Sequence, residues 1–232
     1  MQTVKFGLLA PGHIVSFDEL HSYIKRAESI GIDGIFFFDH LWPHGHPEKP
    51  ALDSLIASAI VLNNSSTLFS GPIVLRVTAR GVESSFSKLV TLHKLYNPRF
   101  LCSIGAGDKK SLAEDSFISA TELTFENRIK ALTELIERLK PNISDLWLGG
   151  SGPQIQKLAQ ELDIGLNIWD KDIDFIRSIS NAIKISWSGP FDSLTHNPIT
   201  FLKSLVDLNV HWIIIGWPPD FKSLSDIISK TK

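Results

Sequence analysis

The chain repeats one pattern eight times: a short apolar run, a turn, and a stretch with apolar residues at helical spacing. Short runs rich in β-branched and aromatic residues predict buried strands, and apolar residues three and four positions apart predict amphipathic helices. The expected strands cover residues 4–10, 34–38, 67–75, 100–105, 145–148, 164–168, 183–187 and 210–215. Eight strand–helix units predict a closed parallel (β/α)8 barrel, a TIM barrel of the α/β class. An open doubly wound sheet is the alternative.

The bulk properties fit one compact domain over residues 1–232, without a linker or low-complexity tract. A formal net charge of −2 gives no reason to expect nucleic acid or an anionic membrane as partner. The single cysteine, Cys102, excludes an internal disulfide and is expected in the core. No apolar run approaches the roughly 18 residues of a membrane span, and the first strand begins without a signal peptide. We therefore expect a cytoplasmic protein.

The unusual residues are concentrated in the connections that follow the strands. These connections are long, whereas those that lead from helices into strands are short, such as Gly31-Ile32-Asp33. Active sites of (β/α)8 barrels lie at the carboxyl ends of the strands. The chemistry is therefore expected at that end.

The second expected strand ends in Asp39, His40, Leu41 and Trp42. An imidazole that titrates near neutral pH can exchange protons during catalysis. Asp39 either orients His40 or bonds to the backbone. The competing interpretation is a partly exposed histidine at a strand end, with no chemical role.

Glycines mark three further candidate positions. Gly149-Gly150-Ser151-Gly152 lies between a strand and a helix, where backbone amides favour a phosphate, although a tight turn uses glycines equally well. Gly105 and Gly107 suggest close approach of a ligand, with Asp108 as a second acid or base and Lys109 and Lys110 as contacts for an anion or ordinary surface residues. The segment Gly71-Pro72-Ile73-Val74 interrupts the third strand and predicts a bulge or an unusual peptide. Arg80 is either an anion contact or a member of an ion pair.

Tryptophans and histidines offer weaker signals. Four tryptophans fall at or just beyond strand ends, where they would form walls for a planar ring or pack between loops: Trp42, Trp169, Trp187 and Trp217. His40, His44 and His46 lie close together, but two of them fall in a loop rich in proline and glycine. A catalytic zinc site needs three well-placed ligands. We therefore expect no metal.

The ordered motifs resemble the bacterial-luciferase-like flavin oxidoreductase superfamily over nearly the whole chain. The resemblance depends on the order and spacing of the motifs rather than on any single one. The matching segments are 27–34 leading to Asp39-His40-Leu41, then 71–74, 92–100, 105–108, Arg128 with its helix, 146–153 and 208–210.

The resemblance implies a barrel that binds FMN or the deazaflavin coenzyme F-420 in its mouth. The ring would lie over the peptide at Ile73 and Val74, which in the family is often a non-proline cis bond, and the phosphate would bind at 149–152. In the F-420 branch an Asp-His pair takes part in proton transfer at the reactive ring position, and Asp39 and His40 match it. Trp42 matches an aromatic residue of that branch, and Asp108 stands where some members carry a longer glutamate.

One departure bears on the reaction. Family members commonly have an insertion after the fourth strand, whereas the interval from Gly107 to Asp145 predicts little beyond one helix. A less covered pocket admits water, which favours hydride transfer over oxygenation. We therefore expect an oxidoreductase for a small organic substrate, with F-420 preferred over FMN. The alternatives are a reduced-FMN monooxygenase, a non-catalytic flavin-binding relative and an unrelated phosphate-sugar barrel enzyme. Members often dimerise, so a homodimer is a further expectation.

Overall fold

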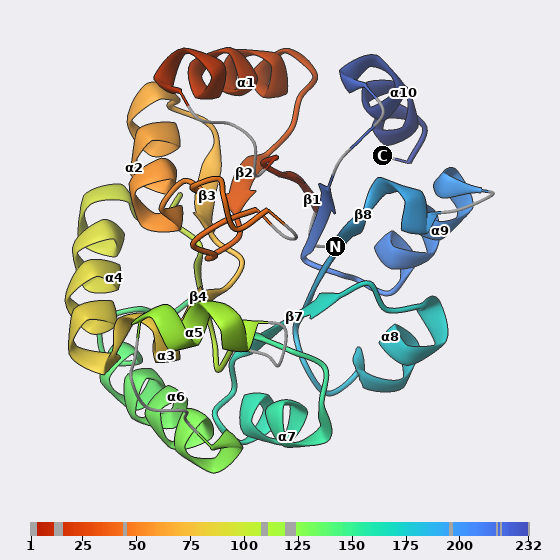
Figure 1. Ribbon diagram of the computed structural model, residues 1–232. Coiled ribbons are helices and arrows are strands. Elements are labelled where there is room, and N and C mark those ends of the chain that lie inside the picture. Colours follow the sequence, from red (N-terminus) through yellow and green to blue (C-terminus); the bar gives the residue numbers. More distant parts are fainter. Residues whose placement is uncertain are drawn as a thin grey trace.

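The structure is a computed structural model that describes residues 4–11, 16–43, 46–107, 111–118, 124–194, 197–216, 218 and 220–231. Its strands form one parallel sheet in the order β3-β2-β1-β9-β8-β7-β6-β5-β4. Figure 1 shows this sheet surrounded by helices. In chain order the elements are β1 (Lys5–Leu9), α1 (Phe17–Ser29), β2 (Gly34–Phe37), α2 (Ser54–Asn64), β3 (Phe69–Pro72), β4 (Leu75–Arg76), α3 (Val77–Arg80), α4 (Val82–Tyr96), β5 (Cys102–Gly105), α5 (Leu112–Ile118), α6 (Phe125–Leu139), β6 (Leu146–Gly149), α7 (Pro153–Glu161), β7 (Gly165–Trp169), α8 (Ile173–Ile179), β8 (Ile185–Pro190), a 3-10 turn (Phe191–Leu194), α9 (Pro198–Asp207), β9 (Trp212–Gly216) and α10 (Phe221–Thr231).

The sheet closes because its two outermost strands, β3 and β4, are halves of one interrupted strand. Ser70 of β3 forms a parallel bridge with Phe100, just before β5. The Ser70 amide donates to the Arg99 carbonyl at 3.0 Å, and the Leu101 amide donates to the Ser70 carbonyl at 2.9 Å. These bonds complete a barrel with eight strand positions. The predicted (β/α)8 architecture is confirmed, and the open-sheet alternative is excluded.

The helices form where the sequence supplies caps and an apolar stripe. Ser16 caps α1, since its Oγ accepts a hydrogen bond from the Glu19 amide at 3.2 Å, which satisfies an amide that the helix itself leaves unpaired. Leu20, Ile24 and Ala27 then follow on one buried face. The same logic holds in α6, which Thr124 caps.

The core has two layers. The larger lies between the strands and the surrounding helices and includes the buried Cys102, which confirms its predicted core position. The smaller fills the barrel and consists of Leu9, Phe36, Ile73, Leu101, Trp147, Trp212 and Ile214. A packed barrel has no through-channel, so a ligand must bind above this filling.

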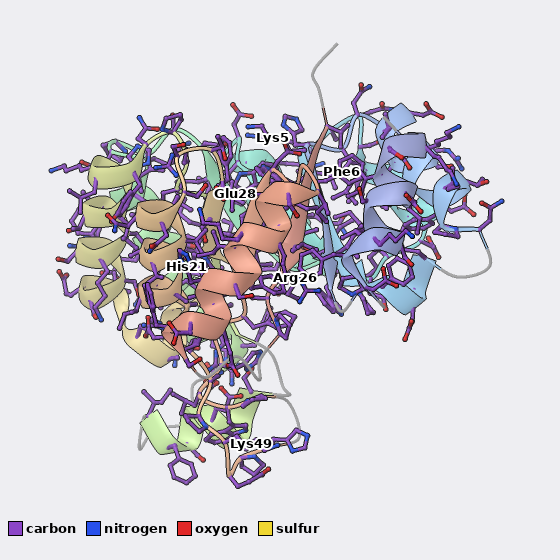
Figure 2. All side chains as sticks on the ribbon, turned by 90° about the horizontal axis from the view of Figure 1, so that it is seen from above. Lys5, Phe6, His21, Arg26, Glu28 and Lys49 are labelled. Atoms are coloured by element: carbon purple, nitrogen blue, oxygen red, sulfur yellow. The ribbon has the colours of Figure 1, made fainter. Side chains whose placement is uncertain are left out.

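The carboxyl ends of the strands lie at one end of the barrel, which we call the mouth. Figure 2 shows α5 and the segment around Lys49 standing out together from the rest of the molecule on the side of the mouth. Helix α5 corrects the expectation that 107–145 holds little beyond one helix. Within the described ranges, no helix combines the length and the apolar character needed to cross a membrane.

Candidate active site

His40 lies three residues after the end of β2, and α5 fixes its orientation. Its Nδ1 is 2.8 Å from Oε1 of Glu114, and the Leu41 amide donates to Oε2 of the same carboxylate at 3.0 Å. The Glu114 side chain is 7% exposed, whereas that of His40 is 32% exposed. Because Glu114 engages Nδ1, the other ring nitrogen, Nε2, is the one placed to meet a ligand.

Arg76 holds Glu114 in place. This arginine ends β4 and donates from Nη2 to Glu114 Oε2 at 2.6 Å and from Nη1 to Asp115 Oδ1 at 3.1 Å. Its own side chain is only 6% exposed. Arg128 of α6 adds a second cation, 3.8 Å from Oδ2 of Asp115. Charge-assisted bonds at such low exposure are weakly screened by solvent, so α5 is bound to the mouth through its two acids.

Of the two roles expected for Asp39, the structure shows the bond to the backbone, because Glu114 rather than Asp39 contacts His40 Nδ1. The buried Asp39 carboxylate instead accepts hydrogen bonds from Ser54 Oγ at 2.8 Å and from the Arg76 amide at 2.9 Å, and it pairs with Arg80. A carboxylate with this many donors orders the backbone around His40. Its participation in proton transfer stays a prediction.

Arg80 is a member of an ion-pair network rather than a free anion contact. It bridges Asp39 and Asp53, the latter at 2.8 Å from Nη1. Burial alone would lower the pKa of Arg80, but its hydrogen bonds to Asp39 and the charges of both acids raise that pKa overall. Asp53 also caps α2 through bonds from the Leu55 and Ile56 amides.

The peptide between Ile73 and Val74 is cis, as the resemblance implies. This peptide separates β3 from β4 and brings Val74 against the ends of β5 and β6. A Cβ added at Gly105 would lie 2.5 Å from a Val74 methyl, and one added at Gly149 would lie 2.6 Å from both methyls. These two glycines therefore make room for Val74. Direct contact of Gly105 or Gly149 with a cofactor stays a prediction.

The turn after β6 leads to the amino end of α7. The Gly150 amide donates a hydrogen bond to the Asn167 carbonyl at 3.0 Å. Gly152 is the N-cap residue of α7, and Pro153 follows it. Gln156 Nε2 donates to the Ser151 carbonyl at 2.7 Å, which stiffens the turn. A Cβ at Gly152 would meet nothing within 4 Å, so this part of the turn is accessible, as a phosphate site requires.

Among the tryptophans predicted at the rim, Trp169 lies where its ring contacts Phe38, at the end of the opposite strand. Its ring centroid is 5.3 Å from that of Phe38, which is 5.8 Å from the His40 ring. Phe38 follows β2 and Trp169 ends β7, and three strands separate them in the sheet. Their rings therefore meet across the mouth.

The other tryptophans have different surroundings. Trp187 is fully buried, packs on Phe201 at 5.3 Å and donates from Nε1 to the Lys171 carbonyl, so the prediction that it lines a ligand site is wrong. Trp42 stacks edge-on with Phe117 of α5 at 5.6 Å. Trp217 lies outside the described residues, as do Asp108, Lys109, Lys110 and His44.

Two predicted positions remain. Gly107 has a positive φ of 73°, and a Cβ there would lie 3.1 Å from Thr78 Oγ1 and 3.6 Å from Arg128 Nη1, so a side chain would be strained and crowded. His46 pairs with the exposed Glu48 at 3.1 Å. No group of three potential metal ligands occurs in the part of the chain that the structure describes.

Residues 4–143 match the family model described as luciferase-like monooxygenase, which is more than half of the chain. The chain belongs to this family. A curated relative of this luciferase-like chain is the 5,10-methylenetetrahydromethanopterin reductase of Archaeoglobus fulgidus, 24% identical over 191 residues. The alignment covers 71% of this chain and 53% of the relative. The chain thus spans about half the length of the curated relative that it matches.

Several solved structures share the fold. An F-420-dependent secondary alcohol dehydrogenase, solved with an F-420–acetone adduct, has a TM-score of 0.82 at 12% identity, with 100% of both chains covered. The coenzyme F-420-dependent tetrahydromethanopterin reductase of Methanopyrus kandleri has a TM-score of 0.71 at 12% identity, with 97% of both chains covered. The oxygenating constituent of 3,6-diketocamphane monooxygenase of Pseudomonas putida, solved with FMN, has a TM-score of 0.60 at 13% identity, covering 82% of this chain and 67% of that one.

Proposed function

We propose that this luciferase-like protein is an oxidoreductase that uses coenzyme F-420 to move a hydride to or from a small organic substrate. The observation that carries the proposal is His40, held through Nδ1 by Glu114 at the same end of the barrel as Val74. The curated relative and two of the structural neighbours are named for methanopterin or F-420 chemistry, which supports this cofactor over FMN.

The residues at the mouth fit a tricyclic ring with a phosphate tail. Val74 presents an apolar side chain on the interrupted strand, braced against Gly105 and Gly149. The turn at 149–152 leads into the amino end of α7, where helix amides favour an anion. When bound, such a cofactor supplies the hydride chemistry. The chain would contribute orientation and a proton route through His40 Nε2.

The test begins with the cofactor. Purified protein is titrated with F-420 and separately with FMN, and visible absorption is followed. Micromolar binding of F-420 with a spectral shift, and none with FMN, is the expected result. Binding of FMN alone, with oxygen consumption coupled to product, would instead identify a reduced-FMN monooxygenase, the second candidate that the FMN-bound neighbour favours.

The role of His40 is tested in the same assay. We expect His40→Ala to lower the rate of cofactor reduction or reoxidation at least about tenfold, because a positioned acid–base group contributes roughly 10²–10⁴ in rate. Cofactor affinity should be nearly kept. The matched control is His46→Ala, because the exposed side chain of His46 pairs with the exposed Glu48. Unchanged stopped-flow rates in His40→Ala would remove this histidine from the mechanism.

A further inference from the structure

We propose that the substrate position beside His40 takes a neutral, apolar, ring-bearing substrate, held against the rings of Phe38 and Trp169. This inference rests on the proposed function and names the substrate class of the same site. It follows from two independent properties of the mouth, namely the aromatic pair that crosses it and the ion pairs that engage the arginines around His40.

The aromatic pair supplies the binding surface. Phe38 and Trp169 meet at 5.3 Å with their planes at 59°, and Phe38 meets His40 edge-on at 5.8 Å. Trp169 is 38% exposed although it is a large apolar side chain. Aromatic faces bind flat apolar groups through area and through ring stacking. A ring placed against Phe38 therefore lies next to the residue that contacts the His40 ring.

The pair also divides the mouth. A line from β2 to β7 divides the strand ends into two groups. The first group is β3 to β6, where Val74, Gly105 and Gly149 lie. The second group is β8, β9 and β1. The proposed cofactor position is on the first side. Phe38 and Trp169 thus border that position, as a surface that holds a substrate next to a cofactor ring must do.

The arginines around His40 are engaged within the protein. Arg76 pairs with Glu114 and Asp115, Arg80 pairs with Asp39 and Asp53, and Arg128 lies 3.8 Å from Asp115. Both partners of the Arg76–Glu114 pair are buried. A substrate carboxylate or phosphate would have to break such a pair to gain one of these arginines, and a buried charge left without its partner is costly. A neutral substrate has no such cost.

The side chains that extend the mouth outward are apolar as well. Leu41 follows His40, and Trp42 packs on Phe117 of α5, which is 82% exposed. Figure 2 shows α5 projecting at this end of the molecule. A ring-bearing substrate that enters past these residues meets apolar side chains on its way to His40.

The experiment compares three ligands of matched chemistry by calorimetry, with the cofactor selected above and without it. Acetophenone is neutral with a ring, phenylglyoxylate replaces its methyl group by a carboxylate, and acetone lacks the ring. We expect acetophenone to bind at least about tenfold more tightly than either of the others. Trp169→Ala should abolish this preference for the ring, Trp169→Phe should largely keep it, and Leu95→Ala, at the far end of α4, should leave it unchanged.

Equal or tighter binding of phenylglyoxylate, or a Trp169→Ala variant that still prefers acetophenone to acetone, would overturn the proposed substrate class. Either result with normal cofactor binding leaves the oxidoreductase proposal standing. Failure of both cofactors to shift the visible spectrum would contradict the proposed function instead, and the cofactor-free titrations would still report the ligand preference.

Discussion

Gly149→Ala is the substitution whose effect the packing at the mouth defines most sharply. The new Cβ would lie 2.6 Å from both Val74 methyls, against an ordinary contact of 3.4–4 Å. Val74 therefore has to move by roughly 1 Å, and overpacking of this kind costs about 1–3 kcal/mol. A loss of about 2 kcal/mol corresponds to a fall in melting temperature of roughly 4–8 °C in a domain of this size.

The assay is urea unfolding followed by circular dichroism, with Gly152→Ala as matched control in the same turn. A Cβ at Gly152 meets nothing within 4 Å, so we expect a change within about 0.5 kcal/mol. In a Val74→Ala background the cost of Gly149→Ala should fall, because the two methyls at 2.6 Å are gone and only the Cβ of residue 74, 3.1 Å away, remains. A Gly149→Ala protein as stable as the parent, or a cost undiminished by Val74→Ala, would refute this packing.

Two further predictions concern the charged residues around His40. Glu114→Ala should destabilise the protein by about 3 kcal/mol, because buried Arg76 loses a partner. It should also slow turnover at least about tenfold, while cofactor affinity changes little. The control is Glu83→Ala, at an exposed pair with Arg138, and equal effects of the two substitutions would contradict the role assigned to Glu114. For Asp53, burial opposes ionisation, but the Ile56 amide and Arg80 outweigh it and lower the pKa of the carboxyl below 3.8. Its stabilising contribution is therefore full above the unfolded pKa and lost as pH falls through the lower folded pKa. The stability difference between wild type and Asp53→Asn should accordingly shrink on acidification below about pH 4, and a difference that grows there would show the opposite sign of linkage.

The fold was predictable from the sequence because each strand is a short, mostly apolar run between turn signals. In a barrel covered by helices both faces of a strand are buried, so residues such as 34–37 and 212–216 carry no polar interruption. Helix α5 escaped prediction because its seven residues are too few to show a helical period. Its adjacent acids, Glu114 and Asp115, were the available signal.

The sequence indicated where the site lies, but not which side chains contact one another there. His40 and the glycine turn stand at strand ends, which local sequence reveals. The partner of His40 is 74 residues away. No local pattern shows that Glu114, rather than Asp39 beside His40 in the sequence, binds the imidazole. The alternation of side chains along a strand would have distinguished Trp187 from Trp169. Asn167 donates hydrogen bonds to Ser186 and Ser188 inside the barrel, so Trp187, which lies between the two serines, points outward.

The position of the cofactor is decided by a crystal structure of the protein with F-420. We expect the ring against Val74, on the side of the Phe38–Trp169 pair where β3 to β6 lie. The phosphate should bind at 149–152, with His40 Nε2 facing the reacting edge and Nδ1 still held by Glu114. A phosphate bound elsewhere, or a ring on the opposite side of the aromatic pair and out of reach of His40, would contradict it.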